Sequence, residues 1–329
     1  MVQAKKSRIE GSGQKTEGSG QRKEVCGSAL VGNYQILGEI GGGNNGKVFL
    51  GLCQTTEKKF VLKQITLKRR SDGIPITFIR EIQVLRKIDH PNLIELKEVI
   101  LGEEEKVANL EAKEFKIYLV FPYLGKDLLV IIKKGVLSQK LVSSYCRQIL
   151  CGIEYLHRES ILHRDIKPAN ILVSRSSEVK IIDFGLSREY VAGDMSQGVV
   201  TRWYRPPELL FNVSRYTTAI DMWSFGCVMG EMVLGRPLFP AKTEGSQLLM
   251  IAKMCGEIDS KVFEAYKLGV GFINRVIGQG CVSQIMAEFG CYSRSFAQLL
   301  ARCLEIDPLK RCTASEALAF LDIQAITPT

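Results

Sequence analysis

The sequence has little of what marks a secreted, membrane-spanning or disulfide-stapled protein. It contains no run of eighteen apolar residues, so we expect no membrane span, and its N-terminus has no apolar segment of the kind that directs secretion. Its ten cysteines include no CxxC pair, which favours buried free thiols in a reducing compartment over disulfides or a metal site. These absences leave the nucleus or the cytoplasm as the expected location.

The composition is that of a globular protein with a basic excess. Of the 329 residues, 46% are hydrophobic and 24% are charged, and the formal net charge is +9. Such a charge is compatible with nucleic acid or acidic proteins as partners. Because no aromatic–basic motif accompanies the charge, and part of the excess lies in residues 1–33, we do not expect nucleic-acid binding.

The order of the sequence patterns predicts two lobes between two tails. Residues 1–33 are basic and rich in Gly and Ser, which predicts a disordered tail. Residues 34–121 are mostly β-patterned, whereas residues 126–321, after a hinge at 122–125, are mostly helical. Residues 322–329 would form a short C-terminal tail. We therefore predict an α+β fold with a ligand cleft between a small β-rich lobe and a larger helical lobe.

Individual elements follow from the spacing of apolar residues. β-branched and alternating runs predict strands at Tyr34–Ile40, Lys47–Leu52, Lys59–Thr66, Ile94–Leu101 and Phe115–Phe121. A helix is predicted to begin near Pro75, because proline is favoured in a first helical turn. Apolar residues at helical spacing predict a long helix ending before residue 161 and further helices at Thr217–Leu234, Gly245–Cys255, Ser293–Leu304 and Thr313–Phe320.

Two stretches of the helical lobe carry side chains suited to phosphoryl transfer. The first reads ILHRDIKPAN and ends at Asn170, and the second reads IIDFG and contains Asp183. If they pack side by side, Asp165 would accept the proton of an attacking hydroxyl and Lys167 would steady the transferred phosphate. Asn170 and Asp183 would hold Mg²⁺. The combination HRDxKxxN followed by DFG resembles the catalytic loop of protein kinases.

A glycine-rich turn and a lysine extend this pattern into the β-rich lobe. Glycines between two strands let a backbone approach phosphates closely. The motif GxGxxGxV is formed here by Gly41, Gly43, Gly46 and Val48. Lys63, on the next predicted strand, would pair with the α- and β-phosphates of ATP.

Three further motifs resemble the cyclin-dependent kinases. Pro75–Glu81 reads PITFIRE, which is similar to the helix signature of this family and especially to its transcriptional, PITALRE-type branch. Motifs similar to the same branch are VVTRWYRPPEL at Val199–Leu209 and YTTAIDMWSFGC at Tyr216–Cys227. A fourth motif, LEIDPLKR at Leu304–Arg311, resembles the closing motif of the protein-kinase domain. The resemblance covers roughly residues 34–320 and does not include the N-terminal tail.

The resemblance implies a bilobal protein-kinase fold with an ATP site in the cleft and Mg²⁺ as the cofactor. Glu81 would position Lys63, and Thr201 would bridge Asp165 and Lys167 by its hydroxyl. A buried ion pair of Glu208 with Arg311 and a bracing role for Asp221 are also implied. The implied ATP site consists of Ile40, Gly41, Gly43, Gly46, Val48, Val61, Lys63, Phe121, Tyr123, Leu124, Asp127 and Leu172.

The resemblance also implies partners and a regulatory site. A cyclin-type subunit would dock on the Pro75–Glu81 helix and push Glu81 toward Lys63. The VVTRWYR segment would accept the proline of Ser/Thr-Pro sites in protein substrates, and the nucleus, with the cytoplasm as a second location, would be the place of action. Ser196 would be phosphorylated and bound by Arg80, Arg164 and Arg188.

Some positions of the sequence differ from the pattern of the cyclin-dependent kinases, and a function without catalysis is the alternative to an enzyme. Asn44 and Asn45 stand at the tip of the glycine turn where cell-cycle relatives have Thr and Tyr, Val61 stands where alanine is usual, and residues 257–295 match poorly. Within the kinase reading, transcription elongation on a polymerase tail is favoured over cell-cycle or cell-division control. The alternative is a catalytically weak pseudokinase or scaffold that binds a cyclin-like partner. The complete set of catalytic residues favours an enzyme.

Overall fold

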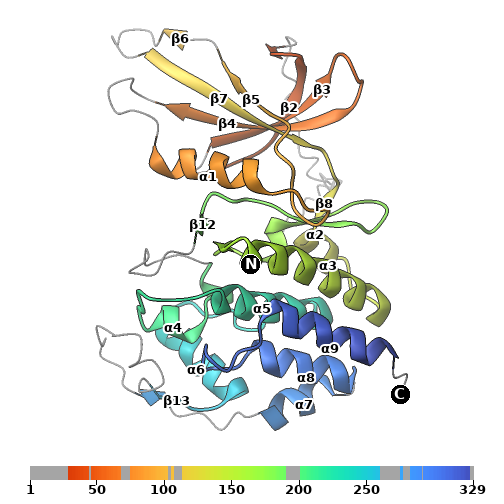
Figure 1. Ribbon diagram of the computed structural model, residues 1–329, viewed down its shortest axis with the longest axis vertical. Coiled ribbons are helices and arrows are strands. Elements are labelled where there is room, and N and C mark those ends of the chain that lie inside the picture. The colour runs from red at the N-terminus through yellow and green to blue at the C-terminus, as the bar shows by residue number, and fades with distance from the viewer. Residues whose placement is uncertain are drawn as a thin grey trace, which may run out of the picture.

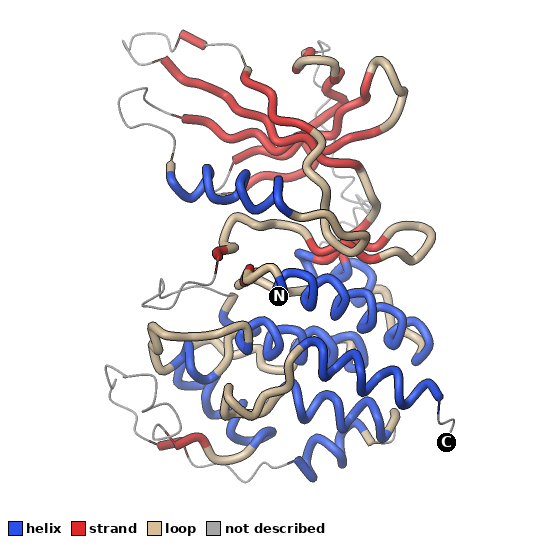
Figure 2. The backbone as a smooth tube through the Cα atoms, viewed as in Figure 1, coloured by secondary structure: helices blue, strands red, loops and turns tan. Residues whose placement is uncertain are grey.

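The computed structural model has two lobes stacked along its long axis (Figure 1). It describes residues 29–43, 46–67, 75–102, 105–106, 113–189, 201–259, 275–276, 282–290 and 292–326. Strands dominate one lobe and helices the other, as Figure 2 shows by colour. The predicted α+β fold is confirmed. Of the disordered tail expected at residues 1–33, residues 1–28 fall outside the described residues, as do Asn44, Asn45 and Ser196. The expectation is wrong for Leu30 and Val31, which form a short strand paired with Tyr34 and Gln35.

The N-lobe is an antiparallel sheet with the order β1-β2-β3-β4-β7-β5, and β6 pairs with β7. Its strands are β1 (Leu30–Val31), β2 (Tyr34–Gly43), β3 (Gly46–Cys53), β4 (Lys59–Leu67), β5 (Glu98–Leu101), β6 (Glu105–Lys106) and β7 (Lys113–Pro122). The helix α1 (Ile76–Lys87) lies beside the sheet on the side that faces the C-lobe (Figure 1). This places the predicted PITFIRE helix at the boundary between the lobes.

One predicted strand is wrong in its first half. The strand expected from residue 94 begins only at Glu98, as β5. The preceding residues instead turn toward the C-lobe, where the N–H of Ile94 donates to the carbonyl of Ile181 at 3.0 Å and Leu93 forms a bridge with Ile181. Partners distant in the sequence therefore override the local β pattern.

The C-lobe is mainly helical and is built around α5. Its helices are α2 (Leu128–Ile132), α3 (Gln139–Arg158), α4 (Pro207–Leu210), α5 (Ala219–Leu234), α6 (Glu244–Cys255), α7 (Val282–Phe289), α8 (Arg294–Cys303) and α9 (Ala314–Ile326). The predicted helices are confirmed, whereas the short α2, α4 and α7 were not predicted. The helix α9 continues to Ile326, past the predicted end at Phe320 and into the expected C-terminal tail at 322–329. Within the described residues, no helix is both long and apolar enough to cross a membrane.

Short strands and two 3₁₀ turns place the motif residues on the C-lobe surface that faces the sheet. The strands are β8 (Lys126–Asp127), β9 (Ile161–Leu162), β10 (Ile171–Val173), β11 (Val179–Ile181) and β12 (Arg188–Glu189). Two further short strands, β13 (Ile258–Asp259) and β14 (Arg275–Val276), pair with each other, and Figure 1 shows β13 at the end of the C-lobe away from the N-lobe. The 3₁₀ turns are Pro168–Asn170 and Arg202–Tyr204. The strand β10 pairs with β8 and β11, and β9 pairs with β12. These pairings hold the two halves of the phosphoryl-transfer motif side by side, as the sequence predicts.

Candidate active site

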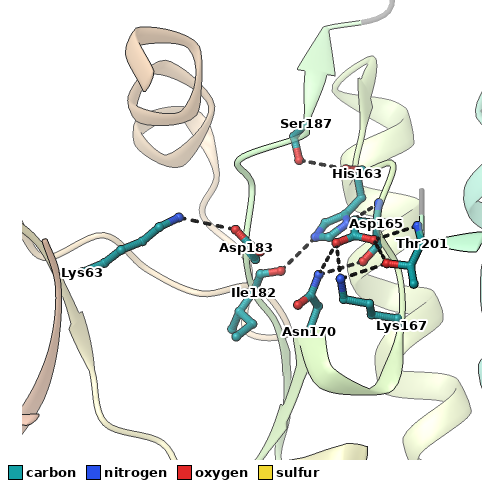
Figure 3. Close-up of polar contacts among 9 residues, drawn as sticks. All are labelled: Lys63, His163, Asp165, Lys167, Asn170, Ile182, Asp183, Ser187 and Thr201. Atoms are coloured by element: carbon teal, nitrogen blue, oxygen red, sulfur yellow. Dashed lines mark hydrogen bonds and ion pairs between the residues drawn. The ribbon is translucent and has the colours of Figure 1, made fainter. Parts of the chain in front are cut away.

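Three side chains surround the carboxylate of Asp165, which is buried between β9 and the first 3₁₀ turn (Figure 3). Its Oδ1 accepts from the hydroxyl of Thr201 at 2.9 Å and from the Thr201 N–H at 3.3 Å. Its Oδ2 accepts from Lys167 Nζ at 2.6 Å and from Asn170 Nδ2 at 2.9 Å. Lys167 Nζ also donates to Thr201 Oγ1 at 3.0 Å, so this hydroxyl joins Lys167 to Asp165.

The second carboxylate, Asp183, lies between this network and the N-lobe (Figure 3). Lys63 Nζ donates to Asp183 Oδ1 at 3.4 Å and to Glu81 Oε1 at 2.7 Å. Burial alone would lower the pKa of Lys63, but the negative charges of Glu81 and Asp183 outweigh it and raise the pKa. The lysine therefore stays charged at neutral pH and joins α1, β4 and the DFG segment.

Two residues next to the catalytic side chains have left-handed backbone conformations, which are uncommon for residues other than glycine. Arg164 has φ +66° and Asp183 has φ +67°. The Arg164 conformation is held by Asp221, whose carboxylate accepts from the N–H groups of His163 at 2.9 Å and Arg164 at 2.8 Å. The predicted bracing of the catalytic loop by α5 is therefore present.

Asp221 is fully buried, and its hydrogen-bond partners favour the ionised form of its carboxyl group. Burial alone would raise the pKa of Asp221, but the interaction with His157, whose Nε2 lies 3.0 Å away, and the hydrogen bond from the Arg164 N–H help to lower the pKa. On the DFG side, the ring of His163 contacts the carbonyl of Ile182 at 3.0 Å and packs edge-on against Phe184 with centroids 5.1 Å apart. Phe184 is buried, and Asp183 is consequently directed toward the cleft.

A cavity of about 560 Å³ opens between the lobes beside these residues. Half of the predicted ATP-site residues line it, namely Gly46, Val48, Val61, Lys63, Phe121 and Leu172. The other six, Ile40, Gly41, Gly43, Tyr123, Leu124 and Asp127, lie outside this lining. Pro122, which belongs to the predicted hinge, lines the cavity as well. The lining residues that the prediction did not assign to the ATP site are Gly42, Glu81, Leu85, Ile94, Asn170, Ile182, Asp183 and Phe184.

The six residues outside the lining have different environments. Ile40 and Tyr123 are exposed, whereas Leu124 packs against the hydrophobic core. Asp127 accepts from the N–H of Val130 at 2.7 Å and so caps the N-terminus of α2. Apolar lining residues such as Ile94 carry no chemical signature in a sequence, and only the packing of the lobes brings them to the cavity.

The donor set next to the cavity fits Mg²⁺. Asn170 commits its Nδ2 to the backbone and side chain of Asp165, which leaves its Oδ1 as an acceptor that Figure 3 shows turned away from Asp165. Asp183 offers a carboxylate whose side chain is 37% exposed. Two such oxygen ligands, completed by phosphate oxygens and water, are typical of Mg²⁺ at nucleotide sites.

The segment after Thr201 is fixed to the C-lobe by its side chains. Trp203 Nε1 donates to the carbonyl of Ala241 at 3.1 Å, and Arg205 forms an ion pair with Glu244 at 2.7 Å. The segment thus presents a rigid surface beside Asp165.

The predicted ion pair of Glu208 with Arg311 is present and buried. Arg311 NH1 and NH2 donate to the two Glu208 oxygens at 2.6 and 3.0 Å. Arg311 further donates to the carbonyl of Ala219 at 2.9 Å, and its guanidinium lies over the ring of Trp223. This bidentate pair anchors α4, which follows the Trp203–Arg205 segment.

The predicted regulatory arginines are in different environments. Arg164 is buried and donates to the carbonyl of Leu186 at 2.6 Å and the hydroxyl of Tyr216 at 2.8 Å. Arg80 is exposed on α1 and Arg188 is half-buried on β12. A convergence of the three on residue 196 remains a prediction.

The helix α1 has an apolar edge but already holds its glutamate in place. Ile76 and Ile79 are 57% and 37% exposed. Glu81, on the buried side, contacts Lys63 in the single chain. The expectation that Glu81 needs a partner protein to reach Lys63 is therefore not supported by this geometry.

Comparison with known proteins agrees with this site. The protein kinase domain family matches residues 34–320, so the chain belongs to the protein kinases. Among its curated relatives, cyclin-dependent kinase C-1 of Arabidopsis thaliana is 34% identical over 89% of this chain and 60% of that protein. Cyclin-dependent kinase 12 of Drosophila melanogaster is 35% identical over 92% of this chain but only 26% of that protein. Probable cyclin-dependent kinase 10 of Dictyostelium discoideum is 35% identical over 87% of this chain and 77% of that protein. Within the protein kinases, the chain is therefore of the cyclin-dependent type.

Proposed function

We propose that this protein is a cyclin-dependent serine/threonine kinase that transfers the γ-phosphate of ATP to Ser/Thr-Pro sites. The observation that carries the proposal is the arrangement of Asp165, hydrogen-bonded to Lys167, Asn170 and Thr201, beside a cavity that contains Lys63 and Asp183. Fixed charges around the site of phosphoryl transfer are the main catalytic device of such enzymes.

Each side chain has a defined task in this proposal. Asp165 orients the substrate hydroxyl and accepts its proton, while Lys167 stabilises the negative charge on the transferred group. Lys63, positioned by Glu81, binds the phosphates of ATP. Mg²⁺, held by Asn170 and Asp183, would neutralise charge on the phosphates.

The partner and the cellular role rest on the resemblance and on the exposed edge of α1. A cyclin-type subunit would cover Ile76 and Ile79, since exposed apolar side chains on a regulatory helix favour a protein contact. The resemblance of the PITFIRE motif to the transcriptional branch supports action in the nucleus, in transcription elongation in preference to cell division. The names of the relatives support a cyclin-dependent kinase. The substrates would be proteins with Ser/Thr-Pro sites.

A pseudokinase scaffold is the competing function, and a phosphotransfer assay separates the two. The chain, purified together with its stoichiometric partner, is supplied with γ-labelled ATP, Mg²⁺ and a Ser-Pro peptide, with a Ser-Ala peptide as the matched control. We expect label in the Ser-Pro peptide only. Binding of nucleotide without transfer to any peptide or copurified protein would favour the scaffold.

Phosphorylation of Ser196 is the proposed activating step. A phosphate there would supply about −1.5 to −2 charges to arginines from α1, the catalytic loop and β12. We expect Ser196→Ala to lower the activity of the partner-bound enzyme about tenfold, a coupling of ~1–3 kcal/mol. Full activity of Ser196→Ala, with no phosphate on the active wild-type enzyme, would exclude this step.

A further inference from the structure

Two buried thiols of the C-lobe lie in direct contact. Cys303 ends α8, Cys312 lies on the turn before α9, and their sulfur atoms are 3.7 Å apart. All the described cysteines are free thiols. A disulfide has sulfur atoms about 2.0 Å apart, so small side-chain movements would bring these two within bonding distance.

The backbone around the two thiols is held in place by a hydrogen bond and by close packing. The N–H of Cys312 donates to the carbonyl of Arg302 at 3.2 Å, which ties the two ends of the intervening loop together. On the other side of Cys303, α5 passes so closely at Gly226 that an added Cβ would lie 2.9 Å from the Cβ of Cys303. Closing the bond would therefore order little that is not ordered in the thiol form.

The two sulfurs differ in access and in acidity. Cys303 is 0% exposed and Cys312 is 7% exposed, so a small oxidant reaches Cys312 first. The hydrogen bond from Cys303 lowers the pKa of the Cys312 thiol against the effect of burial, and Arg302 and Arg311 add to the lowering. Thiolate character and access are what make a cysteine sensitive to oxidation.

We propose that Cys303 and Cys312 are a redox modification site, at which hydrogen peroxide converts the thiol pair into a disulfide. The Cys312 sulfur attacks one peroxide oxygen, so that an S–O bond forms, the O–O bond breaks, and the departing hydroxide leaves as water with the proton of the Cys312 thiol. The Cys303 sulfur then attacks the Cys312 sulfur, the S–S bond forms and the S–O bond breaks. The second hydroxide leaves as water with the Cys303 proton, and the two electrons lost by the sulfurs are those gained by the peroxide.

The Cys303–Cys312 disulfide would close the loop that carries Arg311. This loop holds Glu208 through the buried ion pair, and the Arg311 side chain donates to the loop carbonyls of Glu305 at 2.9 Å and Ile306 at 3.3 Å. Closing so short a loop restricts the unfolded chain, and we expect the oxidised protein to melt about 5 °C above the thiol form. Such a reversible bond suits a protein of a reducing compartment, where disulfides are transient.

Peptide mapping of the wild-type chain tests the proposal. The reduced full-length protein is treated with hydrogen peroxide, its remaining thiols are alkylated, and the digest is read by mass spectrometry. We expect one cross-linked pair of peptides containing Cys303 and Cys312, lighter by two hydrogens and separated by a dithiol reductant. Alkylation of both thiols after treatment, a bond from either one to another cysteine, or an oxidised protein that melts no higher than the thiol form would overturn the proposal.

Variants test the order of the two steps. Cys303→Ser removes the second sulfur, so we expect a sulfenic acid at Cys312 that a cyclic 1,3-diketone traps, whereas Cys312→Ser should leave Cys303 unmodified. Cys227→Ser, which removes another buried thiol of the same lobe, is the control and should still form the cross-link. Trapping at Cys303 in Cys312→Ser would overturn the assignment of Cys312 as the attacking sulfur. The wild-type mapping decides the main question even if a variant fails to fold.

Discussion

Replacing Asp165 by Asn tests the chemistry of the site with almost no change of shape. Each carboxylate oxygen of Asp165 accepts from two donor groups, Oδ1 from the N–H and hydroxyl of Thr201 and Oδ2 from Lys167 and Asn170. Whichever way the Asn amide is turned, its NH₂ faces donors that have lost their acceptor. An unsatisfied buried donor costs ~1–3 kcal/mol of stability.

The catalytic loss should be larger than this structural cost predicts. An amide cannot accept the proton of the substrate hydroxyl, so we expect kcat to fall by ~10²–10⁴, the usual contribution of a general base. The KM for ATP should change little, because Lys63 and the cavity lining remain. The assay is the initial rate of Ser-Pro peptide phosphorylation by the partner-bound enzyme at saturating ATP.

A matched acid-to-amide control separates chemistry from folding. Asp322→Asn on α9 removes a carboxylate that pairs with Arg147 at the surface, far in sequence from the catalytic loop. It should retain wild-type kcat and melting temperature. Turnover by Asp165→Asn equal to that of this control would refute the role of Asp165, and so would a loss of activity fully explained by unfolding.

Four further predictions concern the metal, the interface, the buried ion pair and the pH dependence. Asp183→Ala should remove the dependence of nucleotide binding on Mg²⁺, measured by titration calorimetry, and an unchanged metal dependence would exclude Asp183 as a ligand. Ile79→Glu should abolish partner binding in a pull-down while sparing the melting temperature of the single chain, and intact binding would move the interface away from α1. Glu208→Gln should cost about 3–5 kcal/mol in urea unfolding because it leaves Arg311 buried without its partner charge, and a cost below 1 kcal/mol would contradict this. The pKa of Asp221 is lowered in the folded state, so the ionised carboxylate stabilises the fold above the unfolded-state pKa of about 3.9, and this stabilisation is lost as the pH falls through the folded-state pKa. The difference in free energy of unfolding between wild type and Asp221→Asn should therefore shrink below about pH 4. A difference that does not change with pH would count against an ionised Asp221.

The catalytic loop could be predicted from the sequence because its chemistry is local. Asp165, Lys167 and Asn170 lie in one short stretch of the sequence, so the motif that they form can be recognised without knowledge of the fold. Glu208 with Arg311 is a long-range pair, and only the resemblance to a family predicted it. The two lobes could be predicted because apolar residues recur with the spacing of strands in residues 34–121 and with the spacing of helices in residues 126–321. Each spacing marks the side chains that face the core of that lobe.

The parts that escaped prediction depend on contacts between distant segments. Ile94 is not part of the expected strand because its N–H donates to the carbonyl of Ile181 in the other lobe. Ile94 also lines the cavity. Ile182 lines the cavity without any chemical signature. The contact of Cys303 with Cys312 flanks the LEIDPLKR motif, but the motif alone does not say that the two sulfur atoms meet.

Transfer of labelled phosphate is the most direct test of the central claim. The partner-bound chain is incubated with γ-labelled ATP, Mg²⁺ and a Ser-Pro peptide, and the product is mapped by mass spectrometry beside the Asp165→Asn variant prepared in the same way. The account predicts phosphoserine at the Ser-Pro site with wild type and at least a hundredfold less with the variant. No transfer by the wild type, or equal transfer by both proteins, would contradict it.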